Sequence, residues 1–157
     1  MAAPATLESA VRVSPPMVVG AAVALTVLLP VWIMPVLARA GGWTILAQRY
    51  PASAPMPSPK TRFGYGVFAG WVGYNGALVV ASDGSGLYLS VWPLLAWAHP
   101  PVFIPWTDVE RIEHGRSFAG RVHELRVRRA PEVRFALRDR TYALVREDAA
   151  AAGVSGA

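Results

Sequence analysis

The hydrophobic pattern separates one long apolar run from a series of short segments in which apolar and polar residues alternate. Residues 17–38 carry no charge, and Thr26 has the only polar side chain of the run. A helix of this length extends about 33 Å, close to the thickness of the hydrocarbon core of a bilayer. Because such a helix has no face suited to water, we expect a transmembrane helix at 17–38, preceded by a flexible tail at 1–16.

Other interpretations of the run stay open. A buried core helix would normally show one polar face. A signal peptide is favoured by the A-x-A-like site at 38–40, although a signal core is usually only about 7–15 residues long. Within a membrane helix, Pro30 and Pro35 predict kinks. Gly20 and Ala24 form a small-xxx-small pair, which predicts weak homodimerisation.

The charges that flank the run predict its orientation. Arg39, Arg49, Lys60 and Arg62 all precede Asp83, the first acidic residue after the run. Basic flanks lie on the cytoplasmic side of bacterial inner membranes. We therefore expect a single-pass protein of the cell membrane whose C-terminal domain is cytoplasmic.

A short juxtamembrane region is expected at 39–60. Trp43, Leu46, Ala47 and Tyr50 recur at helical spacing, so this part of the chain predicts a helix with one apolar face. That face suits either the lipid headgroup layer or the surface of the following domain. Four prolines between residues 51 and 59 then predict an extended linker.

Residues 61–148 have the pattern of a small β domain. The turn sequence at 83–86 joins an apolar strand to the alternating segment 87–92, which predicts a hairpin with Leu87, Leu89 and Val91 in the core. A second hairpin is expected between 122–129 and 132–138. Its inward-facing residues are expected to be Leu125, Val127, Val133, Phe135 and Leu137.

The C-terminal part predicts a helix at 140–148, capped by Asp139, and then a flexible tail at 149–157. The order of the elements indicates an α+β protein. It consists of an N-terminal transmembrane helix followed by a small antiparallel β-barrel or bent sheet of about six or seven strands, closed by a C-terminal helix as in pleckstrin-homology (PH-like) folds.

Several short motifs carry a resemblance to a known group of proteins. They are Gly42-Trp43, Leu46-Ala47 and Tyr50-Pro51 after a single span, then the segment 86–90 and Ile104-Pro105-Trp106. Together they resemble a family of uncharacterised bacterial single-pass membrane-anchored proteins with a PH-like domain. The resemblance covers roughly residues 41–145. It implies the PH-like fold and transfers no catalytic residue.

Composition narrows the chemistry. The chain of 157 residues has room for the anchor and one modest domain, and it contains no cysteine, which excludes disulfides and thiolate metal sites. His99, His114 and His123 lack metal-ligand spacing. No catalytic, cofactor or metal site is predicted.

Two groups of residues are candidates for binding. Strand alternation places Arg126 and Arg128 opposite Arg134 and Arg138, which predicts a basic surface. The loop after residue 91 carries Trp92, Leu95 and Trp97, which would form a wedge for the headgroup boundary or a partner protein, or would fold onto the domain's own core.

These features favour a non-enzymatic, membrane-tethered interaction module that binds anionic lipid headgroups or a membrane protein. The alternatives are a subunit of a membrane enzyme and a periplasmic or secreted domain released after signal-peptide cleavage. Nucleic-acid binding is not expected, because the basic residues are not interleaved with exposed aromatic residues on the same face.

Overall fold

The computed structural model describes residues 15–58, 60–117 and 120–157. The predicted flexible tail at 1–16 therefore lies almost wholly outside the described residues. The chain divides into two compact units, one that ends at Ile33 and one formed by Met34–Ala157. Helix α1 (Pro15–Ala40) begins in the first unit and ends in the second.

Most of the described side chains of helix α1 before Met34 are apolar and exposed. Its exposed large apolar side chains are those of Val18, Val19, Val23, Leu25, Leu29, Trp32, Ile33 and Val36. Gly20 and Ala24, the predicted pair of small residues, are also exposed. Among the described residues, which leave out several side chains of 17–38, no helix is long and apolar enough to cross a membrane.

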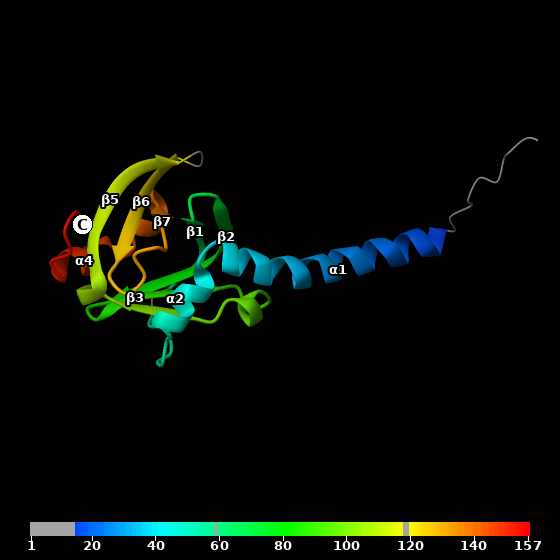
Figure 1. The fold of residues 1–157 in the computed structure, drawn as a ribbon, viewed down its shortest axis with the longest axis horizontal. Helices are drawn as coiled ribbons and strands as arrows, with labels where there is room; N and C mark the ends of the chain where they lie inside the picture. Colours follow the sequence, from blue (N-terminus) through cyan, green and yellow to red (C-terminus); the bar gives the residue numbers. More distant parts are fainter. Residues whose placement is uncertain (1–14, 59, 118–119) are drawn as a thin grey trace, which may run out of the picture. The chain divides into compact units, whose positions relative to one another are not determined.

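The second unit is built on a curled antiparallel sheet of seven strands that forms a half-barrel (Figure 1). The strands are β1 (Thr61–Phe68), β2 (Val72–Asp83), β3 (Gly86–Val91), β4 (Val102–Pro105), β5 (Val109–Ser117), β6 (Gly120–Val127) and β7 (Phe135–Arg138). Their order in the sheet is β4-β3-β2-β1-β7-β6-β5. Strand β1 is therefore the central strand, with β2, β3 and β4 on one side and β7, β6 and β5 on the other. This architecture confirms the expected bent antiparallel sheet of an α+β domain.

A break in the strand register helps the sheet to curl. The pairing of β1 with β2 shifts on both sides of Gly64. A side chain at that position would place its Cβ 2.9 Å from the backbone oxygen of Leu78, so only glycine fits where the two strands approach. Irregularities of this kind increase the local bend and twist of a strand.

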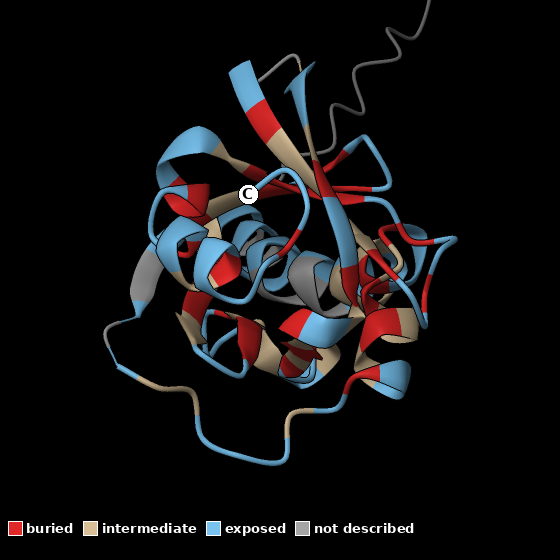
Figure 2. Ribbon diagram, turned by 90° about the vertical axis from the view of Figure 1, so that its left-hand side faces the viewer, coloured by how far each residue is buried: buried red, intermediate tan, exposed pale blue. Residues whose placement is uncertain are grey.

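The first predicted hairpin is confirmed, since Asp83 pairs with Gly86 at the turn between β2 and β3. Leu87, Leu89 and Val91 are buried as expected. The inward-facing residues of the second predicted hairpin are buried too, but β7 begins only at Phe135. Figure 2 shows how buried residues, in red, are interspersed with exposed ones along the strands.

Helix α2 (Trp43–Arg49) packs on the domain, which decides between the two surroundings considered for its apolar face. Trp43, Leu46 and Tyr50 are fully buried. The Trp43 ring lies 5.3 Å from the Phe68 ring and 5.5 Å from the Tyr74 ring, measured between centroids. The segment after the apolar run is thus part of the core.

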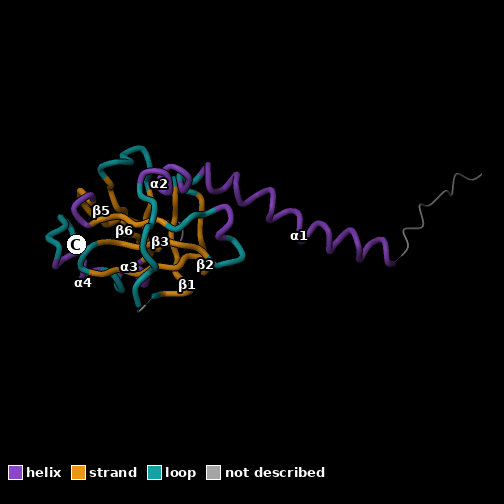
Figure 3. The backbone as a smooth tube through the Cα atoms, turned by 90° about the horizontal axis from the view of Figure 1, so that it is seen from below, coloured by secondary structure: helices purple, strands orange, loops and turns teal. Residues whose placement is uncertain are grey.

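The C-terminal region differs from the expected single helix. It forms two short helices, α3 (Asp139–Tyr142) and α4 (Arg146–Ala151), beside the strands shown in orange in Figure 3. Asp139 lies in the first turn of α3 and makes no side-chain cap. The expected flexible tail instead packs against β5, because Val154 is buried and the Ser155 carbonyl accepts a hydrogen bond from Ile112 N–H.

Candidate functional site

The loop that joins β3 to β4 separates the three apolar residues predicted to act together. Trp97 is 56% exposed, and Leu94, a neighbour in the same loop, is 79% exposed. Leu95 is only partly buried but packs against the core. Trp92 lies apart from Trp97, lining a hollow of about 710 Å³ with Phe63, whose ring centroid is 5.6 Å away.

A buried histidine holds this loop in place. The Tyr74 hydroxyl lies 2.7 Å from His99 Nε2, and His99 Nδ1 lies 3.3 Å from the Leu95 carbonyl oxygen. Because a carbonyl only accepts, Nδ1 carries the proton and Nε2 accepts from the tyrosine. The Trp43 indole donates to the Pro100 carbonyl at 2.9 Å. The bonds to Tyr74 and Trp43 tie the C-terminal end of the loop to the core.

Burial determines the charge state of this pair. It lowers the pKa of His99, which therefore stays neutral, and it raises the pKa of the Tyr74 hydroxyl. The role of His99 could not be predicted from its surroundings in the sequence, since its partner Tyr74 is 25 residues away in the chain.

Two loops that carry exposed apolar residues lie beside the chain segment 35–41. Trp97 lines a hollow of about 330 Å³ together with Pro35, Ala38 and Arg39. The segment also adjoins the β1–β2 turn, because a Cβ at position 41 would lie 3.3 Å from Phe68 and 3.4 Å from Val72, the residues that flank that turn. That turn carries Trp71, which is 61% exposed. We name the exposed residues of these two loops, Trp71, Leu94 and Trp97, the apolar loop surface.

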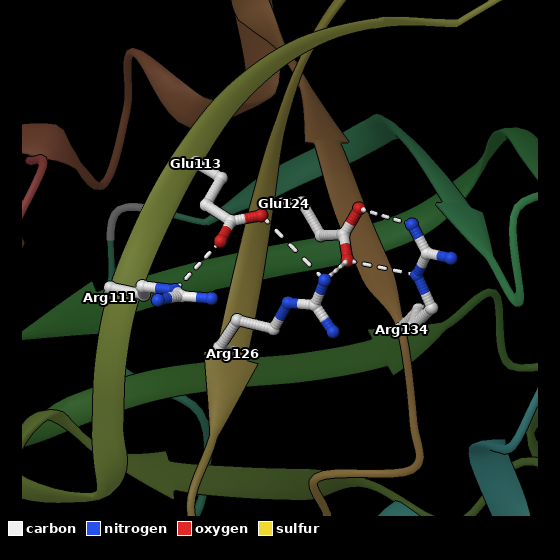
Figure 4. A network of polar contacts seen from close by, with 5 residues as sticks. All are labelled: Arg111, Glu113, Glu124, Arg126 and Arg134. Carbon is white, nitrogen blue, oxygen red and sulfur yellow. Dashed lines mark hydrogen bonds and ion pairs between the residues drawn. The ribbon is translucent and has the colours of Figure 1, made fainter.

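Most of the predicted basic surface is neutralised by carboxylates (Figure 4). Arg126 lies 3.0 Å from Glu124 and 3.7 Å from Glu113, measured between nitrogen and oxygen. Arg134 contacts the same Glu124 at 3.1 Å, which raises the pKa of its guanidinium. Arg111 pairs with Glu113 at 2.7 Å. Strand register thus sets carboxylates between the arginines.

Of the two remaining predicted arginines, one is also paired. Arg128 Nε lies 3.8 Å from Glu110. Arg138 lies apart from the other three, opposite Val122 near the hairpin end of β6, with its guanidinium carbon 5.3 Å from the centre of the Tyr65 ring. The structure therefore does not bring the predicted arginines together as one unpaired patch.

A different set of arginines gathers at the turn between β5 and β6. Arg116 and Arg121 are cross-strand partners, and a Cβ at Gly120 would lie 3.7 Å from an Nη atom of Arg138. Arg121, Arg138 and Arg140 line one hollow of about 330 Å³. In the described part of the chain, no carboxylate lies within 4 Å of any of these guanidinium groups. We name Arg116, Arg121, Arg138 and Arg140 the arginine cluster.

A chain of hydrogen bonds borders the arginine cluster. His123 Nε2 lies 2.9 Å from an Asp139 carboxylate oxygen, and His114 Nδ1 lies 2.8 Å from His123 Nδ1. The hydrogen bond from His123 lowers the pKa of Asp139, so the carboxylate is ionised and accepts. The His123 ring also stacks on Tyr142, 4.0 Å between centroids.

The spacing of the two histidines could have revealed this contact. His114 and His123 are symmetrically placed about the β5–β6 turn, so a hairpin at that turn makes them cross-strand partners. Metal-ligand spacing does not predict this contact, whereas equal distance from a hairpin turn does. Among residues 15–58, 60–117 and 120–157, no group of three or more histidine and acidic residues could hold a metal ion.

Comparison with known proteins gives no match to a family model, a curated protein or a solved structure. The geometry described above is therefore the basis for a functional proposal.

Proposed function

We propose that this protein is a non-enzymatic interaction module, tethered to the cell membrane by residues 17–38, whose domain binds anionic lipid headgroups at the cytoplasmic leaflet. The observation that supports the proposal best is the apolar loop surface beside residues 35–41. Tryptophan and leucine side chains exposed on neighbouring loops are costly in water and favourable at a membrane interface. Their position beside the end of the apolar run is where an anchored domain would meet the bilayer.

Helix α1 provides independent support. Eight of its described large apolar side chains are exposed, as expected for a helix whose surroundings are lipid. Arg39 follows the apolar run, and an arginine there can extend its charged end to the headgroup layer. Excess basic residues after the run favour the cytoplasmic side for the domain.

Charge and architecture agree with this proposal. The formal net charge of +5 would attract the domain to an anionic leaflet, at about 1 kcal/mol for each basic residue near the surface. A curled seven-stranded sheet with C-terminal helices is also the architecture that the resemblance to bacterial PH-like membrane-anchored proteins implies. We therefore propose the PH-like relationship as well.

Extraction of membranes tests the tether. Membranes that contain the full chain are washed with alkaline carbonate, and we expect the protein to stay in the pellet. The variant Val23→Asp with Leu29→Asp is expected to be released, whereas Leu144→Asp, which changes an exposed leucine of the domain, should stay. A wild-type chain that washes off would contradict the proposal.

Orientation and processing need a second measurement. The domain should be protected from protease added outside intact cells, and the mass of the chain from cells should include residues 17–38. Digestion from outside, or a mass that starts after residue 40, would favour the periplasmic or secreted alternative.

A further inference from the structure

We propose that the arginine cluster is a binding site for a phosphate group. It is distinct from the basic residues considered above, because only Arg138 was among them. The inference adds a ligand class to the proposed headgroup binding and rests on that function only for the choice of a lipid source. Its basis is the contrast between arginines that have carboxylate partners and arginines that do not.

Strands β5, β6 and β7 and helix α3 each contribute one arginine to the cluster. Arg116 and Arg121 stand opposite each other at the end of the β5–β6 hairpin. Arg138 is the last residue of β7, and its cross-strand partner is Val122, the neighbour of Arg121. Arg140 follows in α3 and lines the same hollow as Arg121 and Arg138. All four arginines therefore sit at one end of the sheet.

Their placement is unfavourable without an anion. Like charges directly opposite on neighbouring strands destabilise a sheet, and Arg116 and Arg121 are such a pair. Elsewhere on the same strands the sequence places carboxylates between the arginines, as with Glu113 and Glu124. A bound anion would remove the repulsion at the turn in the way that these carboxylates do nearby.

The space available suits a group of phosphate size. One hollow of about 330 Å³ is lined by Tyr65, Arg121, Arg138, Asp139 and Arg140. A second, of about 370 Å³, is lined by residues that include His114, Arg116, Arg121, His123 and Asp139. Arg121 and Asp139 border both hollows, so the two adjoin. Guanidinium groups bind phosphate oxygens with two parallel hydrogen bonds, which a single ammonium group cannot form.

The one carboxylate that lines either hollow is already bound. Asp139 accepts a hydrogen bond from His123, which in turn is held by His114 and by stacking on Tyr142. This chain of contacts directs the carboxylate to the histidine. The ionised carboxylate also interacts electrostatically with Arg121, but the four arginines outnumber it, so the cluster keeps a net positive charge for a ligand.

The test uses the full chain in lipid nanodiscs and follows the arginine side-chain Nε–H signals by NMR. In the first arm the discs contain only zwitterionic lipid, and glycerol 3-phosphate is added. In the second arm the discs contain increasing phosphatidic acid, which carries the same phosphate monoester on a lipid. Saturable shifts at Arg121 and Arg138 in the first arm indicate a soluble ligand. Shifts in the second arm alone indicate a lipid headgroup.

Matched variants distinguish phosphate binding at a specific site from nonspecific attraction to the net positive charge of the domain. Arg121→Gln with Arg138→Gln should weaken phosphate binding at least tenfold, because hydrogen bonds to charged groups are lost. Arg111→Gln with Arg128→Gln removes the same charge elsewhere on the sheet and should weaken binding less than twofold. Arg121→Lys with Arg138→Lys keeps the charge and should still lose affinity, and it guards against a glutamine variant that does not fold.

No saturable binding in either arm, or equal losses in the two glutamine variants, would overturn the site. The proposed function fails separately: a chain that carbonate releases from membranes but that still binds glycerol 3-phosphate with these preferences would keep the site and lose the tether.

Discussion

The two halves of the sheet are built alike inside and differ outside. Strands β2, β3 and β4 contain a single charged residue, Asp83, whereas β5 and β6 both contain arginine and glutamate and β7 ends in Arg138. Leu87 and Leu89 in the first half are as fully buried as Leu125 and Leu137 in the second. The comparison shows that the core needs only the inward-facing positions. The remaining positions are free to differ. In one half the connecting loops expose apolar residues, and in the other half the strands carry charged residues.

The apolar half depends on its buried aromatic residues, so the largest effect is expected there. Trp43→Ala removes a fully buried ring that contacts Phe68 and Tyr74 and should cost about 3–5 kcal/mol of unfolding free energy. Trp97→Ala, at an exposed position, should cost less than about 0.5 kcal/mol. Denaturant unfolding of the full chain in detergent, followed by near-UV circular dichroism, measures both. Equal losses of unfolding free energy in the two variants would show that Trp97 is part of the core and not of an exposed loop.

Two neighbouring leucines sharpen the distinction between loop surface and core. Leu95→Asp places a charge where the side chain packs against the core and should cost about 2–4 kcal/mol. Leu94→Asp alters a side chain that is 79% exposed and should change stability by less than about 0.5 kcal/mol. The same unfolding measurement tests both. A costly Leu94→Asp would place that leucine in the core instead.

Acid should weaken the apolar half through His99. Its pKa is lowered in the folded state from the ordinary 6.5, so the unfolded chain takes up the proton more readily. The contribution of neutral His99 is fully present above pH 6.5 and is lost as the pH falls from 6.5 toward the lower folded-state value. The limiting slope is about 1.4 kcal/mol per pH unit. As the pH falls from 7.5 to 5, the unfolding free energy of wild type should fall relative to that of His99→Gln, at no more than this slope. Parallel curves would refute the prediction.

The smallest effect is expected in the charged half. Arg126→Gln breaks contacts with Glu113 and Glu124 at the edge of solvent and should cost about 0.2–1 kcal/mol. Raising the salt concentration to about 1 M should reduce that difference, because the Debye length falls to about 3 Å. A cost above about 2 kcal/mol, unchanged by salt, would mean that the network carries the fold as the aromatic core does.

Local pattern was enough to predict much of this fold. The turn sequence at 83–86 and the alternation after it fixed the β2–β3 register, because a slip of one residue would expose Leu87 and Leu89. The burial of Leu125 and Phe135 followed from the same alternation. Exact limits at the C-terminus did not follow, since Asp139 is drawn to His123, a residue 16 positions earlier, instead of capping a helix.

The candidate sites depended on contacts between distant parts of the chain. Whether an arginine is paired is decided by register across three strands. This register places Glu124 beside Arg126 and Arg134 but leaves Arg121 with no carboxylate within 4 Å among the residues that the structure describes. The residues predicted to form one wedge do not act together in the structure, again because of contacts with distant parts of the chain. Each of Trp92, Leu95 and Trp97 meets a different neighbour brought from elsewhere in the chain.

Placement of the apolar loop surface in a membrane is the central claim, and the absence of cysteine allows a direct test. Single cysteines at Leu94→Cys and Leu144→Cys, both at exposed leucines, would carry an environment-sensitive fluorophore on the full chain in vesicles that contain anionic lipid and lipid-bound quenchers. We expect strong quenching of the label at position 94 and little at position 144. Equal quenching at the two positions, or none at position 94, would contradict the account.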